Sequence, residues 1–250
     1  GNTSTNSMSV SGSDQTAPAL AGTWPDNITE QNNCFVNRDI SGLLSTDSVK
    51  ALYTDNCGGV VTVTSRDTVT GNDCEWAVIR TYTIKDACGN TSTNSMSVSG
   101  SDQTAPDITC NGDLTPDTDD GKRYATVTLQ NPTSVDNCSA SATYSISYSP
   151  ATPTNATATN ASGQYPLGVT IVTYSVVDGC GNADSCSFTI NVSDNQAPVI
   201  TCAVNGNQDV LPNSAGNTYT HSGNSWNATA TDNVAVDSLT YTLTGATVDN

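Results

Sequence analysis

The eighteen residues GNTSTNSMSVSGSDQTAP occupy positions 1–18 and recur unchanged at positions 89–106. A diverged third copy, ending in NVSDNQAP, closes on Ala197-Pro198. The three Ala-Pro joints are therefore 88 and 92 residues apart. An identity of this length indicates duplication, and a regular period of this size is typical of tandem-repeat architectures. The chain is predicted to consist of units of about 90 residues, each closing on an Ala-Pro joint.

The joints divide the sequence into four parts. Residues 1–18 are predicted to be the C-terminal strand of a preceding repeat, residues 19–106 and 107–198 to be two whole repeats, and residues 199–250 to be a partial third. The sequence has no initiator Met, no signal peptide and no 18-residue apolar run. We therefore expect a fragment of a longer protein, with no direct membrane insertion in this segment.

Composition excludes several classes of function. Seven Lys and Arg residues against 24 Asp and Glu residues give a formal charge of −17, whereas nucleic acids and anionic membranes require a basic face. Nine cysteines accompany a single histidine, His221, and no Cys-x-x-Cys pair, which disfavours zinc. Disulfides in an exported protein are the better interpretation, and they would reinforce the small core of a 90-residue unit.

Two cysteine motifs occur in both whole repeats. Asp-Asn-Cys ends at Cys57 and at Cys138, and Asp-x-Cys-Gly-Asn contains Cys88 and Cys180. Because each whole repeat carries both motifs, we predict the bonds Cys57–Cys88 and Cys138–Cys180. Each bond should stabilise its repeat by about 2–4 kcal/mol.

The other cysteines occur in one whole repeat only. Cys110 and Cys186 are confined to the second repeat, so they are predicted to pair, and Cys34 and Cys74 of the first repeat are predicted to pair by the same logic. Cys202 matches Cys110, and its partner would lie beyond residue 250. A different pairing of the same cysteines within each repeat stays open as the alternative.

Period-two alternation of apolar and polar residues predicts strands. The clearest example is CSFTINV at residues 186–192, and β-branched residues dominate TIVTYSVV at residues 170–177. Further strands are expected at residues 77–85, 124–129 and 143–148, separated by clusters of Gly, Pro, Asn and Asp. Several short strands per 90 residues, without a helical stripe, predict an all-β fold of tandem immunoglobulin-like β-sandwich repeats.

These strings resemble a known family. APDITC at residues 105–110, APVITC at 197–202, YPLGVTIVTY at 165–174, DGCGN at 178–182 and CSFTINV at 186–192 are similar to the HYR (hyalin repeat) family. More narrowly, they resemble the repeats of giant cell-surface gliding adhesins of Bacteroidota, of the SprB-like type. The first repeat departs from the pattern with Gly22 in place of the early cysteine, and the third has Val234 where the others have the cysteine of Asp-Asn-Cys.

The resemblance implies an extracellular filament at the cell surface, exported by type IX secretion and used in gliding motility and attachment. Its partners would be neighbouring repeats of the same chain and external surfaces or polysaccharide. A glycan- or protein-binding module, or an accessory array of a secreted hydrolase, are the alternatives. No catalytic motif is present, and His221 lies in a Gly/Asn/Ser-rich stretch typical of a solvated loop, so we expect no enzyme and no cofactor required for catalysis.

Two further kinds of site are suggested by short motifs. Four carboxylates, Asp113, Asp117, Asp119 and Asp120, lie within eight residues, and together with Asp194 they suggest calcium, although an acidic turn in solvent explains them equally simply. Asp-Ser/Thr followed by an apolar residue resembles the O-glycosylation motif of exported Bacteroidota proteins. The candidate acceptors for O-linked glycans are Ser48, Thr68 and Ser238, with Ser185 as a weaker match.

Overall fold

Strands make up nearly all of the regular structure in the computed structural model, which describes residues 1–138, 142–150, 153–157, 160–203, 219 and 223–242. His221 lies outside the described residues. The fold is all-β, as predicted. Clustering of contacts gives two compact units: unit 1 comprises residues 1–107, 134–143 and 176–184, and unit 2 comprises residues 108–133, 144–175 and 185–250.

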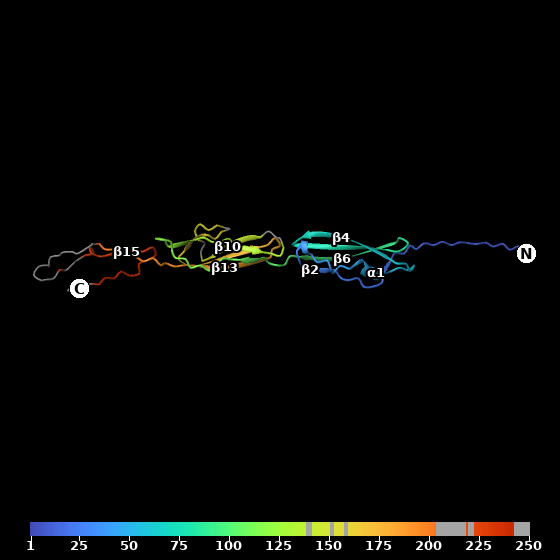
Figure 1. The fold of residues 1–250 in the computed structure, drawn as a ribbon, viewed down its shortest axis with the longest axis horizontal. Coiled ribbons are helices and arrows are strands. Elements are labelled where there is room, and N and C mark those ends of the chain that lie inside the picture. Colours follow the sequence, from blue (N-terminus) through green and yellow to red (C-terminus); the bar gives the residue numbers. More distant parts are fainter. Residues whose placement is uncertain (139–141, 151–152, 158–159, 204–218, 220–222, 243–250) are drawn as a thin grey trace. The chain divides into compact units, whose positions relative to one another are not determined.

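The segment between the first two Ala-Pro joints contains six strands and one short helix. The strands are β1 (Ala19–Leu20), β2 (Ile28–Asn32), β3 (Tyr53–Thr54), β4 (Thr62–Asn72), β5 (Glu75–Lys85) and β6 (Thr91–Ser101). A 3-10 turn spans Phe35–Asn37, and helix α1 spans Thr46–Ala51. Four strands form one sheet in the order β2-β6-β5-β4, in which β2 runs parallel to β6 and the other pairs are antiparallel (Figure 1).

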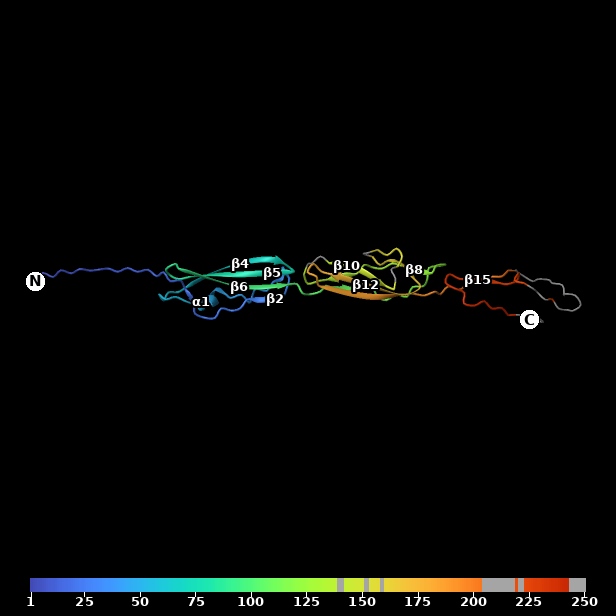
Figure 2. The same ribbon diagram turned by 180° about the vertical axis from the view of Figure 1, so that it is seen from behind.

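The core of unit 1 lies on one face of this sheet. Alternate residues of β5 point inward, so Trp76, Val78, Tyr82 and Ile84 are at most 1% exposed. Val49 of α1 packs into the same cluster, and Figure 2 shows α1 beside the sheet. The helix is too short for sequence periodicity to reveal it. It begins where the Ser45 hydroxyl accepts a hydrogen bond from the Ser48 N–H.

The segment from Asp107 to Pro198 contains seven strands. They are β7 (Asp107–Thr109), β8 (Tyr124–Val127), β9 (Thr133–Val135), β10 (Thr143–Ser149), β11 (Gly163–Pro166), β12 (Gly168–Val177) and β13 (Ala183–Val192). Their pairings are β7 with β9, β8 with β11, and β10-β12-β13. β14 (Val199–Thr201) pairs with β15 (Thr229–Thr231). In unit 2 the rings of Tyr174 and Phe188 stack, and Val172 and Ile190 are fully buried.

Residues 1–18 contain no strand in this chain, and their assignment as the C-terminal strand of a preceding repeat stays a prediction. The identical residues 89–106 contain β6, which is hydrogen-bonded on one side to β5 and on the other to β2. Within the described part of the chain, residues 1–18 form no such ladder.

No helix in the described residues has the length and apolar character that crossing a membrane would need.

Candidate functional site

One disulfide joins the two cysteines found only in the second repeat. Cys110, directly after β7, bonds Cys186 on β13, with Cα atoms 5.9 Å apart. The comparison of repeats proposed this same pair. Both cysteines belong to unit 2.

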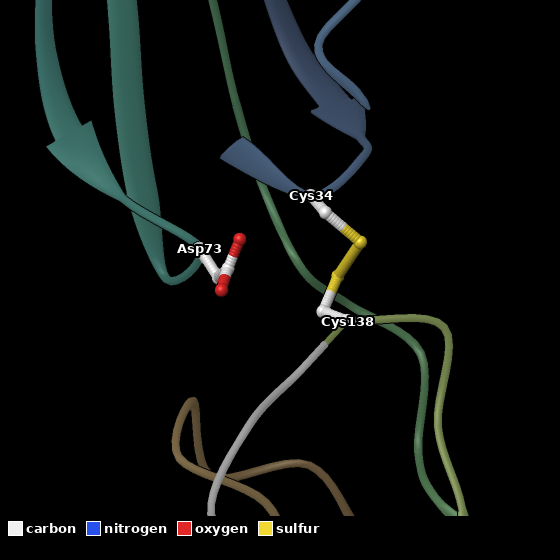
Figure 3. Close-up of side chains that lie close together, drawn as sticks. All are labelled: Cys34, Asp73 and Cys138. Atoms are coloured by element: carbon white, nitrogen blue, oxygen red, sulfur yellow. A yellow bond between two sulfur atoms is a disulfide. The ribbon is translucent and has the colours of Figure 1, made fainter. Parts of the chain in front are cut away.

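The first of two bonds in unit 1 joins Cys34 to Cys138. Cys34 follows β2, Cys138 follows β9, both are 3% exposed, and their Cα atoms are 5.3 Å apart. Figure 3 shows this bond with the carboxylate of Asp73 beside it. The predicted bond Cys34–Cys74 is therefore wrong. Cys34 faces the Asp-Asn-Cys loop of the following sequence repeat rather than a cysteine of its own repeat.

The second bond in unit 1 joins Cys74 to Cys180, with Cα atoms 4.9 Å apart. Cys74 lies in the turn between β4 and β5, where the Asn72 side chain accepts the Cys74 N–H at 2.9 Å. Cys180 lies in the turn between β12 and β13. The predicted bond Cys138–Cys180 is wrong, because each of these cysteines bonds the preceding repeat.

The predicted bond Cys57–Cys88 is also wrong, since both thiols are free and exposed. Partial desolvation raises the pKa of the Cys57 thiol, and the charges of Asp14 and Asp55 raise it further. Cys57 and Cys88 hold the sequence positions of Cys138 and Cys180. Cys202 is free and exposed as well.

The Asp-x-Cys-Gly-Asn motif builds a rigid turn that presents Cys180. The Asp178 carboxylate accepts the Cys180 N–H at 2.7 Å and the Asn182 N–H and side-chain amide at 2.9 and 2.8 Å. Gly181 has a φ of 92°, which a residue with a side chain rarely adopts. Burial raises the pKa of Asp178, but these hydrogen bonds outweigh it and hold the pKa below the ordinary aspartate value.

The same turn is built at Asp86 in the first repeat. Asp86 accepts the Gly89 and Asn90 N–H groups at 2.6 and 2.8 Å and the Asn90 side-chain amide at 2.7 Å. Burial raises its pKa, and hydrogen bonds from Asn90 and Gly89 reverse the shift to a net lowering. In both turns the asparagine side chain also donates, at 3.2 Å, to the backbone carbonyl of the aspartate in the Ser-Asp-x-x-Ala-Pro segment, Asp14 or Asp102. The two motifs therefore meet in space at each joint.

The sulfur atoms next to Asp73 cannot act as metal ligands. Cys34 and Cys138 are bonded to each other, so neither is a thiolate. The Asp73 carboxylate accepts the Phe35 N–H at 2.8 Å. This group in Figure 3 is a disulfide with a capping aspartate, and it offers no soft-metal site.

The carboxylates suggested for calcium from the sequence are not brought together. Asp113 accepts the Thr189 N–H, Asp117 the Asn195 amide, and Asp119 the Thr126 hydroxyl and N–H. Asp120 is exposed, and Asp194 accepts the Gln196 N–H and the Thr118 hydroxyl. Among the described residues, no group of three potential metal ligands contains any of these five. Hydrogen bonds from Thr189, Thr126 and Gln196 hold the pKa values of Asp113, Asp119 and Asp194 low.

The four candidate glycan acceptors are all exposed to solvent. Ser48 lies on α1, Thr68 on β4, Ser185 on β13 and Ser238 after β15. Ser48 also shares a hydrogen bond with the Ser45 hydroxyl. Their position permits modification, which stays a prediction.

Comparison with known proteins agrees with the sequence motifs. Residues 101–192 match the HYR domain family. The chain is 30% identical to "Hyalin" of Lytechinus variegatus over 178 residues, covering 67% of this chain and 31% of that protein. It is 36% identical over 100 residues to "Sushi, von Willebrand factor type A, EGF and pentraxin domain-containing protein 1" of Mus musculus, covering 40% of this chain and 2% of that protein. The chain thus spans about a third or less of the length of these relatives.

Solved structures give only distant likenesses. Drosophila N-cadherin EC1-3 has a TM-score of 0.29 at 14% identity, covering 50% of this chain and 45% of that one. Human protocadherin-24 EC1-2 has a TM-score of 0.33 at 13% identity, covering 58% and 86%. No conclusion rests on them. Residues 101–192 therefore match an HYR domain and lie in an all-β chain.

Proposed function

We propose that this chain is an extended, tension-bearing segment of a secreted cell-surface adhesin. The supporting observation is that two disulfides, Cys34–Cys138 and Cys74–Cys180, each join successive sequence repeats across the Ala105-Pro106 joint. A peptide joint alone extends under load. With two covalent cross-links across it, force passes through the cross-links instead of the joint. A joint cross-linked in this way resists extension under load, as a long adhesive segment requires.

The two free thiols of the first repeat could form the same kind of bond with a preceding repeat. Cys57 and Cys88 stand where Cys138 and Cys180 stand in the next repeat, and both are exposed. A repeat carrying counterparts of Cys34 and Cys74, placed before residue 19, would supply partners for both. We therefore propose that fusing a second copy of residues 19–106 ahead of the first yields two additional disulfides across the new joint. Non-reducing peptide mapping reads them directly.

The net charge of −17 fits a soluble exposed array whose contacts are with external surfaces or polysaccharide rather than with nucleic acid. Many weak contacts along such a segment add up to firm attachment. The finer proposal, a gliding-motility adhesin of Bacteroidota exported by type IX secretion, is supported by the motif strings alone.

Fab fragments raised against residues 19–198 test both the cell-surface adhesin proposal and the finer gliding-motility proposal. We expect them to label intact cells and to reduce attachment to glass or polysaccharide under flow, whereas Fabs against a cytosolic protein should do neither. Labelling that requires permeabilised cells contradicts the surface proposal. Fabs that block attachment but leave cell translocation unchanged contradict the gliding part only.

A further inference from the structure

Buried carboxylate oxygens without hydrogen-bond partners gather at two equivalent places in unit 1. They are Oδ2 of Asp102 and Oδ2 of Asp136, and their counterparts Oδ2 of Asp14 and Oδ1 of Asp55. Asp14 and Asp102 are the aspartates of Ser-Asp-Gln-Thr-Ala-Pro, while Asp55 and Asp136 open the Asp-Asn-Cys motif. Buried polar atoms are nearly always hydrogen-bonded, so a repeated exception requires an explanation.

Asp102 is the most deeply buried of the four, with 4% of its surface exposed. Its Oδ1 accepts the Thr104 N–H at 3.1 Å and the Asn137 side-chain amide at 3.3 Å, which leaves Oδ2 with no partner. The Oδ1 of Asp136 accepts the Cys138 N–H at 2.9 Å, and its Oδ2 is likewise buried and unpartnered. Ligand atoms of Asp102, Asp136 and Cys138 all lie within 4.8 Å of one another.

Two carboxylates this close repel each other unless a positive charge lies between them. Among the described residues, the ion pair that forms joins Arg80 to Asp67. No Lys or Arg side chain in that part of the chain is therefore paired with Asp102 or Asp136. The Cys138 sulfur is bonded to Cys34 and carries no charge. A cation bound between the two unpartnered oxygens would relieve this repulsion.

The first repeat shows the same hydrogen-bond pattern. Oδ1 of Asp14 accepts the Thr16 N–H at 3.0 Å, and Oδ2 of Asp55 accepts the Cys57 N–H at 2.9 Å. Asp14, Asp55 and Cys57 again have ligand atoms within 4.8 Å of one another. In Asp14 and in Asp55, one carboxylate oxygen accepts a backbone N–H two residues further along the chain. The other oxygen is buried and has no hydrogen-bond partner.

A third version lies in unit 2. Asp194 accepts the Gln196 N–H at 3.1 Å, Asp232 accepts the Val234 N–H at 2.8 Å, and the Asn233 amide donates to Asp194 at 3.2 Å. Here the buried oxygen without a partner is the side-chain carbonyl of Asn233. An amide carbonyl is a normal ligand for a hard cation.

We propose that Asp102 and Asp136 bind a calcium ion through their unpartnered Oδ2 atoms. Calcium accepts six to eight oxygen ligands at 2.3–2.6 Å, so two ligand atoms on one ion can be up to about 5 Å apart, as these groups are. Water would supply the remaining ligands. The hard, all-oxygen donor set does not suit zinc or copper, and the adaptable geometry suits calcium better than magnesium.

The ion would tie the segment after β6 to the loop that carries Cys138. Asp102 follows Ser101, the last residue of β6, and Asp136 lies two residues before the Cys34–Cys138 bond. The ion and the disulfide would thus hold the same loop from two directions. This inference concerns a metal site only, and the proposed adhesive function does not depend on it.

The test measures calcium bound per chain by the oxidised 250-residue protein, first stripped with EDTA and then titrated with calcium chloride in a calorimeter. We expect dissociation constants on the order of 10⁻⁴ to 10⁻³ M, as in extracellular modules, and a rise in Tm with calcium. Asp136→Asn should remove one ion per chain, since the amide still accepts the Cys138 N–H but loses the charge. Asp117→Asn, at an exposed aspartate outside this group, is the matched control and should bind as many ions as the wild type.

Peptide mapping that still finds Cys34–Cys138 shows that a variant is folded, and Asp102→Asn replaces Asp136→Asn if it is not. Equal calcium stoichiometry in the wild type and in the folded variant would overturn the proposal. So would a wild type whose Tm ignores millimolar calcium while Asp136→Asn raises the Tm in EDTA, because that pattern identifies a proton shared by the two carboxylates. Magnesium binding as tightly as calcium overturns the choice of ion.

Discussion

The disulfide topology determines how far the chain can be stretched. When the oxidised protein is pulled by its ends, the shortest covalent route follows residues 1–34, crosses to Cys138, returns along the chain to Cys110, crosses to Cys186 and continues to residue 250. This route contains about 125 residues, so the remaining half of the 250-residue chain bears no load. At about 3.5 Å per extended residue, full reduction should lengthen the stretched chain by roughly 40 nm.

Single-molecule force spectroscopy can separate the two bonds that cross the Ala-Pro joint. Without Cys34–Cys138, the shortest route runs through Cys74–Cys180 and is about 18 residues longer, so C34S/C138S should add roughly 6 nm to the stretched length. C74S/C180S is the matched control. It also removes one bond, but that bond is not on the shortest route, so the stretched length should not change.

All variants should carry C57S, C88S and C202S, because the three exposed thiols could otherwise exchange with the disulfides. If the bonds were instead Cys34–Cys74 and Cys138–Cys180, each double variant would remove one cysteine from both bonds. The two variants would then lengthen equally. Equal lengthening, or no lengthening of C34S/C138S, would therefore refute the pairing across repeats.

Three smaller predictions concern the folded units. Tyr165→Phe removes a buried hydroxyl that donates to a backbone carbonyl at 2.6 Å and should lower the free energy of unfolding by about 1 kcal/mol, whereas Tyr148→Phe, whose hydroxyl has no partner, should be neutral or stabilising in the same urea titration. Asp178→Asn should destabilise the protein by about 1–3 kcal/mol at pH 7. Because the pKa of Asp178 is lowered in the folded state, its contribution is present above the ordinary aspartate pKa of about 3.9 and is lost as the pH falls through the folded value, so the stabilities of wild type and variant should converge as the pH is lowered. Peroxide should oxidise Met8, which is 90% exposed, well before Met96, which is 3% exposed; comparable rates by peptide mass would show that residues 1–18 are ordered.

Strand positions could be predicted because the signal for a strand is local. Alternation in TIVTYSVV places Val172 and Tyr174 on one face, and both are fully buried in β12. The strands expected at residues 77–85 and 186–192 lie within β5 and β13. Two-residue periodicity depends only on the alternation of side chains along one strand, so it predicts a strand even where the order of strands in the sheet is unknown.

The disulfide partners could not be predicted in this way, because a bond depends on which loops meet. The comparison of repeats assumed that each repeat closes on itself. The sequence does contain a signal for the alternative. The second repeat has no counterparts of Cys34 and Cys74, and the third has Val234 at the position of Cys138. The second repeat, which lacks a cysteine equivalent to Cys34, is thus followed by a repeat that lacks the cysteine equivalent to Cys138. Disulfides between neighbouring repeats would produce this pattern.

The eighteen-residue duplication shows the limit of local reasoning most clearly. The same letters form a strand at residues 91–101, between β2 and β5, and no strand at residues 1–18. The aspartates within the two copies differ as well: Asp102 is 4% exposed beneath the loop that Cys34 holds through Cys138, whereas Asp14, beside the unbonded Cys57, is only partly buried. Since the local sequence is identical, the difference must come from the neighbouring elements and from the disulfides. The last strand thus needs β2 and β5 of its own repeat, whereas the full burial of Asp102 accompanies the bond to the following repeat. Stability should therefore be a property of adjacent pairs of repeats rather than of single ones.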